Sequence, residues 1–441
     1  MNRYETNART LIWVVLIMLS TACAPNKPYR MHIADEVCER DVKDDRSLCA
    51  EQTAYVIKSE DSSAWLTVYE FDDLGYIRDR DLYDRTMARL ENIHLTADNG
   101  VIMVLFVHGW KHNADPDNEN LKEFEKALVR LAEVETLRSG EKAKTVVGAF
   151  LGWRGLSATT PLMKQLSFWN RKARAHRIGQ NGASILLADL DRINTRYGSN
   201  NTFVAIGHSF GGAILYEATQ QRLLLDLVNK GDGKPVGRSI ADSIILVNSA
   251  FEAARIHNLI ELAKLQDFTD TQRVILMQFT SEGDTPTKTF FRWGRRLSQF
   301  FTDETSSKQE QENVTAVGHH QPFIDYELEP SSGRAADSQI VATVDKLRDQ
   351  GGSMSMKRVE EDGTCAWRAF NSGDTDAFTT ADLTLSRTQG APGPYMMIKV
   401  SKDIITGHND IWPNGTAMQR NFLDLILEIV SIQDARNFYS C

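Results

Sequence analysis

Short apolar runs alternate with amphipathic stretches along most of the chain beyond residue 60. Six runs are candidates for strands, at residues 101–107, 145–151, 202–206, 243–247, 273–279 and 395–400. Runs this short and this continuous are typical of parallel strands buried on both faces. Between them, apolar residues recur at helical spacing, as in 118–135, 184–196 and 422–430. The alternation predicts an α/β fold, a mostly parallel central sheet with helices on both faces.

Two polar stretches interrupt this alternation. Residues 158–178 mix aromatic and basic side chains and are interpreted as a cap-like insertion, with an ordinary amphipathic surface helix as the alternative. Residues 287–390 are rich in Ser, Asp and Gly and are interpreted as a second insertion. The core is then divided into 61–286 and 391–441, the latter holding the last strand, a histidine loop and a C-terminal helix.

The aromatic residues in these insertions lie beside arginines. Leu166, Phe168 and Trp169 belong to the first insertion, and the second begins with Phe290-Phe-Arg-Trp293. Such mixtures suit a cap that contacts an acyl chain and an anionic group together, or a membrane interface. The alternative is that the aromatics are core residues of helices packed on the sheet.

The first residues resemble a secretory signal. Arg3 and Arg9 precede an apolar run at 11–19 that is too short to span a bilayer, and small residues lead to Cys23. We predict a signal peptide over 1–22, lipid attachment at Cys23 and a tether and lead-in over 23–60. The run-in resembles a bacterial lipobox, although Ser20 stands where leucine is usual. The alternative is an ordinary signal peptide cut near Ala22 or Ala24.

Composition limits the remaining classes. A 441-residue chain that is 42% hydrophobic can bury a sizeable core, and a net charge of −9 without a nucleic-acid motif argues against nucleic-acid binding. Of the five cysteines, four remain if Cys23 carries lipid. Outside the cytoplasm they suggest two disulfides among three possible pairings. Cys38–Cys49 is the local option and would leave Cys365–Cys441; free thiols are the alternative.

The strongest chemical signal is a glycine-framed serine between a strand and a helix. Gly207, Ser209 and Gly211 fit G-x-S-x-G, preceded by a β-branched and aromatic run and followed by helical periodicity. That order is the nucleophile elbow, in which a strained turn projects the serine hydroxyl from the strand end. Ser209 is therefore the predicted nucleophile.

A serine nucleophile needs a base and an acid that orients the base. His408 follows the last strand, and Asp284 follows the strand predicted at 273–279, in the chain order Ser, Asp, His. We predict that these two residues complete a triad. Glu252 and Glu282 are alternative acids. His319 and His320 could instead contact substrate or a metal, and Asp410 is expected to order the His408 loop.

An oxyanion hole requires two N–H donors. The Phe210 N–H, directly after the nucleophile, is one candidate. The Trp110 N–H is the other, because His108-Gly-Trp110 follows the strand at 101–107. The His108 side chain is expected to hold this loop in place.

The motifs Phe-Val-His-Gly-Trp, Gly-His-Ser-Phe-Gly-Gly and Gly-His-Asn-Asp resemble those of the α/β-hydrolase superfamily, specifically bacterial lipoprotein-like serine hydrolases. The resemblance spans about 65–285 and 395–435. It implies esterase- or lipase-like activity on a small-molecule or lipid ester, with no metal and no organic cofactor. By resemblance to lipoprotein sorting, Ala24 after Cys23 favours a lipid anchor in the outer membrane, with the protein facing the periplasm or exterior.

Two further functional classes are compatible with the sequence. An acyltransferase would use the same triad with an alcohol in place of water. The other is a non-catalytic envelope binding protein on a hydrolase scaffold. The presence of Ser209, Asp284 and His408 argues against it, because such a scaffold has no need to keep all three.

Overall fold

A computed structural model describes most of the chain. The described residues are 27–44, 48–155, 161–198, 200–231, 234–268, 272–298, 306–331, 336, 338–343, 346, 356–380, 382–412 and 417–433. Cys23 and the predicted signal peptide lie outside these ranges, as does Cys441. In helix residues 161–169 only the backbone is described.

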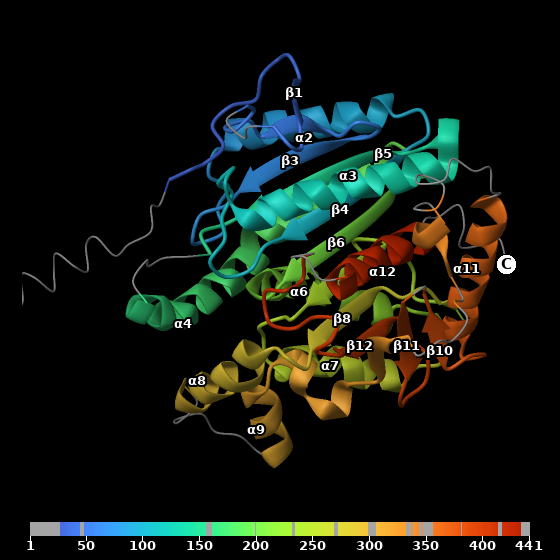
Figure 1. Cartoon of the computed structure of the whole chain (residues 1–441). Helices are drawn as coiled ribbons and strands as arrows, with labels where there is room; N and C mark the ends of the chain where they lie inside the picture. The colour runs from blue at the N-terminus through green and yellow to red at the C-terminus, as the bar shows by residue number, and fades with distance from the viewer. Residues whose placement is uncertain are drawn as a thin grey trace, which may run out of the picture.

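One large mixed sheet forms the centre of the molecule (Figure 1). Its order within the described ranges is β1-β2-β3-β5-β4-β6-β7-β8-β12-β9-β11-β10, twelve strands in all. The strands are β1 Cys38–Asp41, β2 Ala54–Lys58, β3 Ser63–Glu70, β4 Val101–Val107, β5 Thr145–Gly152, β6 Thr202–His208, β7 Ser243–Val247, β8 Leu276–Ser281, β9 Tyr326–Pro330, β10 Ala377–Thr379, β11 Leu383–Arg387 and β12 Tyr395–Val400. From β3 to β12 every neighbouring pair is parallel, which confirms the predicted fold class.

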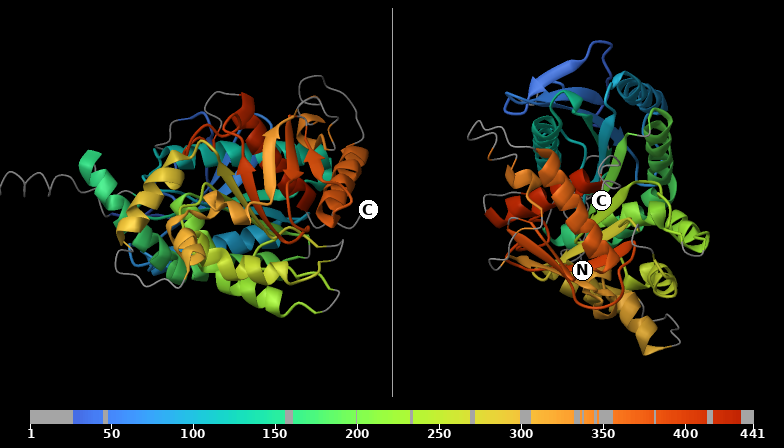
Figure 2. Two further views of the ribbon diagram at one scale, coloured as in Figure 1. Left: turned by 90° about the horizontal axis from the view of Figure 1, so that it is seen from below. Right: turned by 90° about the vertical axis from the view of Figure 1, so that its right-hand side faces the viewer.

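Helices cover both faces of this sheet (Figure 2). The helices are α2 Arg80–Thr96, α3 Glu119–Ser139, α4 Pro161–Ile178, α5 Ser184–Arg196, α6 Phe210–Val228, α7 Ala253–Lys264, α8 Phe291–Ser298, α9 Ser307–Val314, α11 Met356–Ser372 and α12 Ala417–Gln433. Short turns of helix lie at η1 Gly140–Lys142, η2 Gly179–Ala183, η3 Pro286–Phe290, η4 Val317–His319 and η5 Gln321–Phe323.

Strand β4 shows why its sequence is apolar throughout. Ile102, Val104 and Phe106 belong to the core under α3 and α12. Val101, Met103, Leu105 and Val107 belong to the opposite core, under α2, α5 and α6. Because successive side chains of a strand point to opposite faces, a strand covered on both sides must be apolar at every position.

The two polar regions add strands to the same sheet. The predicted lead-in supplies β1 and β2, and the insertion predicted at 287–390 supplies β9, β10 and β11. These strands are short or charged, as in Tyr-Glu-Leu-Glu-Pro of β9, and lack the long apolar runs of the central strands. The strand predicted at 273–279 forms three residues later at its start, as β8 Leu276–Ser281.

The local disulfide is confirmed, since Cys38 is bonded to Cys49 with their Cα atoms 5.9 Å apart. Cys365 is also disulfide-bonded; its expected partner, Cys441, lies outside the described residues. The carboxyl ends of the parallel strands meet at one edge of the sheet, and loops after β4, β6, β7, β8 and β12 converge there. We call this edge the carboxyl edge.

Candidate active site

Ser209 occupies a strained turn between β6 and α6. Its φ of 56° and ψ of −118° are unusual for a residue with a side chain, and such a conformation costs about 1–3 kcal/mol. The turn is possible because glycine, which has no Cβ, occupies two positions where neighbouring backbone passes very close. A Cβ on Gly211 would lie 1.9 Å from the Val107 carbonyl oxygen, and one on Gly207 would lie 2.8 Å from the Gly211 carbonyl oxygen. The predicted elbow geometry is therefore present.

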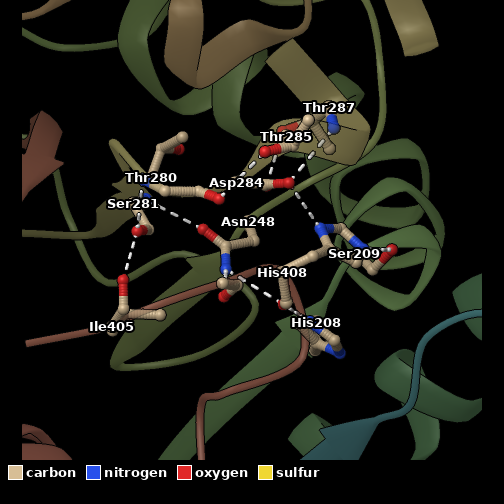
Figure 3. A network of polar contacts seen from close by, with 12 residues as sticks. His208, Ser209, Asn248, Thr280, Ser281, Asp284, Thr285, Thr287, Ile405 and His408 are labelled. Carbon is tan, nitrogen blue, oxygen red and sulfur yellow. Dashed lines mark hydrogen bonds and ion pairs between the residues drawn. The ribbon is translucent and has the colours of Figure 1, made fainter. Parts of the chain in front are cut away.

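The structure brings Ser209, His408 and Asp284 into one hydrogen-bonded line (Figure 3). Ser209 Oγ lies 2.7 Å from His408 Nε2. His408 Nδ1 lies 2.9 Å from Asp284 Oδ1. Since a carboxylate accepts and does not donate, Nδ1 carries the hydrogen and Nε2 is free to accept the serine proton. This is the arrangement that makes a serine hydroxyl nucleophilic.

Asp284 is fully buried and held by further donors. Thr287 donates from its backbone N–H to Oδ1 at 3.1 Å and from its hydroxyl to Oδ2. Burial alone would raise the pKa of Asp284. The neighbouring His408 and these hydrogen bonds outweigh burial and leave the pKa below its usual value. The carboxylate therefore stays ionised at neutral pH.

A second histidine stands behind Thr287. His319 Nε2 lies 2.9 Å from Thr287 Oγ1. Because the Thr287 hydroxyl proton already points to Asp284, its oxygen can only accept, so His319 Nε2 carries a hydrogen. Burial lowers the pKa of His319 to about 4, so the ring is neutral. The line Ser209–His408–Asp284 thus continues through Thr287 to His319.

The loop of His408 is fixed by two side chains from neighbouring strand ends. His208 Nε2 donates to the His408 carbonyl oxygen at 2.8 Å, and Asn248 Nδ2 donates to the same oxygen at 3.1 Å. Asn248 also accepts from the Ser281 N–H at 2.9 Å, which joins the ends of β7 and β8 to the loop (Figure 3). Burial lowers the pKa of His208 to about 3, so it remains a neutral donor.

The loop after β4 approaches the nucleophile as predicted. A Cβ on Gly109 would lie 2.9 Å from the Ser209 Cβ, so only glycine fits at that position. The fully buried His108 accepts from the Trp153 N–H at 3.2 Å, and the Trp153 indole donates to the His108 carbonyl at 3.0 Å. These bonds join the loop to the end of β5, and the close approach of Gly109 places that residue beside Ser209. Phe210 begins α6, whose N-terminal N–H groups favour negative charge.

The two competing acids, Glu252 and Glu282, form ion pairs away from His408. Glu252 is buried in ion pairs with Lys172, Arg255 and Arg295, which outweigh its burial and lower its pKa to about 2. Glu282 lies 3.5 Å from the Lys399 ammonium group. The structure therefore brings Asp284, and neither glutamate, to the His408 ring.

The remaining polar candidates of this region also have partners of their own. Asp410 accepts a hydrogen bond from the Thr406 hydroxyl, within the loop that carries His408. His320 packs edge-on against Phe323, with ring centres 4.6 Å apart. His319 and His320 are adjacent in sequence, yet only His319 is connected to the candidate triad.

Sequence reasoning assigns no role to His208, Asn248 or Thr287. Thr287 has a detectable signal, because Asp284 followed by Pro286 and Thr287 is a helix-start pattern in which the acid accepts from the N–H three residues on. Asn248 has no such signal, because its role depends on three strand ends that meet only in the folded sheet.

The two predicted cap segments are joined to the core by buried charges. Arg171 of α4 pairs with Asp73 at 2.6 Å. Lys172 pairs with Glu252 and lies 4.7 Å from the centre of the buried Phe291 ring of α8. Trp293 is 70% exposed. The aromatics of α8 therefore divide between core and surface. The side chains of Phe290, Leu166, Phe168 and Trp169 lie outside the described part of the structure.

Two further properties bear on chemistry. Within the described ranges, no three His, Cys, Asp or Glu side chains are gathered so that they could hold a metal ion. None of the helices in the described part of the chain combines the length and apolar character needed to cross a bilayer.

No protein-family model and no curated protein matches this sequence. Among solved structures, phospholipase PlaB from Legionella pneumophila is similar at 13% identity and a TM-score of 0.25, over 76% of this chain. The match spans 61% of the length of that protein. At this level of similarity, neither the fold nor the activity of that protein transfers to this chain.

Proposed function

We propose that this protein is a serine hydrolase that cleaves carboxylic esters, lipids among them, with Ser209 as nucleophile, His408 as general base and Asp284 as the acid that orients it. The observation that carries the proposal is the hydrogen-bonded line from Ser209 through His408 to the buried Asp284, on a strained strand-to-helix turn. Fold alone would not support it, because one scaffold can host many functions.

The geometry suggests the following sequence of steps. Ser209 Oγ attacks the ester carbonyl carbon as its proton passes to His408 Nε2. The Phe210 and Trp110 backbone N–H groups stabilise the oxyanion that forms on the carbonyl oxygen. His408 then gives the proton to the leaving alkoxide, and an acyl group remains on Ser209. Water then attacks the acyl carbon as His408 takes its proton, and His408 returns that proton to Ser209 Oγ as the bond between the acyl carbon and Oγ breaks and the acid leaves.

The decisive experiment is labelling with a fluorophosphonate probe, which reacts with activated serines. Ser209→Ala should abolish labelling and lower ester turnover by at least about a thousandfold, because the nucleophile is gone and only binding and the oxyanion donors remain. Ser249→Ala is a matched control: Ser249 is buried at the end of the neighbouring strand, and this variant should still be labelled. Labelling that persists in Ser209→Ala would refute the assignment.

The proposed location is a lipid anchor at Cys23. Its support is the apolar run and the small residues before that cysteine. Mass spectrometry of the mature N-terminus tests it: a diacylglyceryl group on Cys23 is expected, and an unmodified N-terminus at another residue would contradict it.

A further inference from the structure

The first described residues are bound to the carboxyl edge. The backbone N–H groups of Tyr29 and Arg30 both donate to Glu70 Oε2 at 2.8 Å, and Glu70 is the last residue of β3. The Tyr29 hydroxyl accepts from Asn113, and the buried Arg30 donates to the Ala114 carbonyl at 3.1 Å. We call Tyr29 and Arg30 the N-terminal clip. The clip contacts the same loop that brings Gly109 to Ser209.

The strand register sets the distance from the clip to the nucleophile. Glu70 is paired with Gly152, and the ladder continues from Leu151 to Val107 and from Val107 to Gly207. Three spacings of about 4.8 Å place the end of β6 about 14 Å from the end of β3. The point where the chain enters the fold and the elbow thus share one edge, about 14 Å apart.

The chain between Cys23 and the clip is short. Residues 24–28 separate them, and a fully extended chain reaches from Cys23 to Tyr29 over at most about 20 Å. The seven residues of β4 alone span about 23 Å from the amino to the carboxyl edge. A lipid on Cys23 can therefore reach a bilayer that faces the carboxyl edge, but not one beneath the amino edge.

A second surface lies on the other side of Ser209. Strand β8 stands two ladder positions beyond β6, and η3 and α8 follow it at the carboxyl edge (Figure 1). Phe291 is buried and Arg295 pairs with Glu252, so this face of α8 is held by the core. Arg292 and Trp293 are exposed on α8, as is Lys288 on η3. We call these three residues the basic–aromatic patch.

The patch has the composition of a membrane interface. Tryptophan is enriched at the level of lipid headgroups, and Lys or Arg near an anionic surface contributes about 1 kcal/mol each. The chain as a whole carries a charge of −9, so its overall charge does not attract it to an anionic bilayer. Attraction must therefore be local, and the basic–aromatic patch lies on the opposite side of Ser209 from the clip, to which the chain from Cys23 leads.

From these positions we propose that the carboxyl edge faces the bilayer that holds Cys23, with the patch against anionic headgroups, and that the substrates are ester lipids of that same leaflet. This inference rests on the proposed hydrolase function and on the lipid anchor. It names the substrate class that the tether places within reach of Ser209.

The test uses the full lipidated protein in phosphatidylglycerol vesicles that contain a fluorogenic ester lipid. Every rate is divided by the rate on a soluble short-chain ester. A flexible insert of about 30 residues between Asn26 and Lys27 should lower the normalised rate roughly tenfold, because effective concentration falls with about the −3/2 power of tether length. The same insert after Gly231, an exposed site remote from the tether, is the control and should leave the rate unchanged.

Vesicle mixing gives an independent readout. Protein anchored in one vesicle population should hydrolyse ester lipid in its own membrane and leave lipid in a second population largely intact. Equal hydrolysis of both populations, or no effect of the tether insert, would overturn the inference while soluble-ester hydrolysis still upheld the proposed function. If the parent protein did not hydrolyse the soluble ester at all, the proposed function would instead be refuted.

The patch is tested by a paired variant. Arg292→Glu with Trp293→Ser should remove the preference for phosphatidylglycerol over phosphatidylcholine vesicles in the normalised rate. Lys234→Glu with Leu225→Ser also changes one exposed basic and one exposed apolar residue, outside the carboxyl edge, and should keep that preference. If both pairs keep it, the patch does not contact the bilayer.

Discussion

Thr287 makes the clearest link at the residue scale between the candidate triad and the region that follows β8. Its backbone and hydroxyl both donate to Asp284, and its oxygen accepts from His319. Donor and acceptor roles along this line make Asp284 the charged acceptor and place a hydrogen on His408 Nδ1 and on His319 Nε2. The hydroxyl therefore orients the carboxylate that orients His408.

Replacing Thr287 by valine tests this role, because valine has nearly the same shape without the hydroxyl. A hydrogen bond to a charged group contributes about 1.5–3 kcal/mol, so the fluorophosphonate labelling rate should fall roughly 10- to 100-fold. Thr287→Ser keeps the hydroxyl and should label close to the parental rate. If the valine variant labels as fast as the serine variant, the hydroxyl does not support the triad.

Sequence alone is sufficient to bring three distant positions together as a candidate site. Ser209 can be predicted because its motif is local. Asp284 and His408 can be predicted because loops after parallel strands converge at one edge of the sheet. The roles of His208 and Asn248 cannot be predicted from the sequence. Both side chains donate to the backbone carbonyl of His408, and no sequence pattern indicates this contact. His319 can be identified as a candidate from the sequence, but its hydrogen bond to Thr287 cannot.

Elements buried on both faces can be predicted well, and elements at the margins of the sheet cannot. β4 to β8 and β12 have continuous apolar runs because two layers of helices cover them. β9, β10 and β11 lie toward one end of the sheet, where exposed positions accept charged residues such as Glu329. Their sequences therefore resemble loops, and their pairing depends on contacts far apart in the chain.

The aromatic residues of helix α8 lie in different environments, one in the core and one at the surface. Phe291 is fully buried beside Lys172, whereas Trp293 is 70% exposed. Phe291→Ala should destabilise the fold by about 3 kcal/mol and lower the melting temperature by several degrees, since it leaves a cavity. Trp293→Ala, its matched partner, should change stability by less than about 0.5 kcal/mol. Equal melting temperatures for the two variants would contradict the packing of Phe291 in the core.

At the scale of the whole molecule, the carboxyl edge is built around histidines that are kept neutral by burial. Burial lowers the pKa of His108 and His208 to about 3, and that of His112 and His319 to about 4. In the unfolded chain the same residues titrate near 6.5. Between these values the unfolded state binds more protons than the folded state, so acid shifts the equilibrium toward unfolding.

The stability that these histidines confer is fully present above their unfolded pKa and is lost as pH falls below it. Each should contribute about 1.4 kcal/mol of destabilisation between pH 7.5 and pH 5.5, so the melting temperature should fall across this interval. Burial raises the pKa of Asp325 to about 7, and its protonation over the same interval opposes the trend. Asp325→Asn should therefore make the fall steeper. Thermal melts at several pH values measure both effects, and a melting temperature that rises on acidification in both proteins would show that the histidines are not held neutral in the fold.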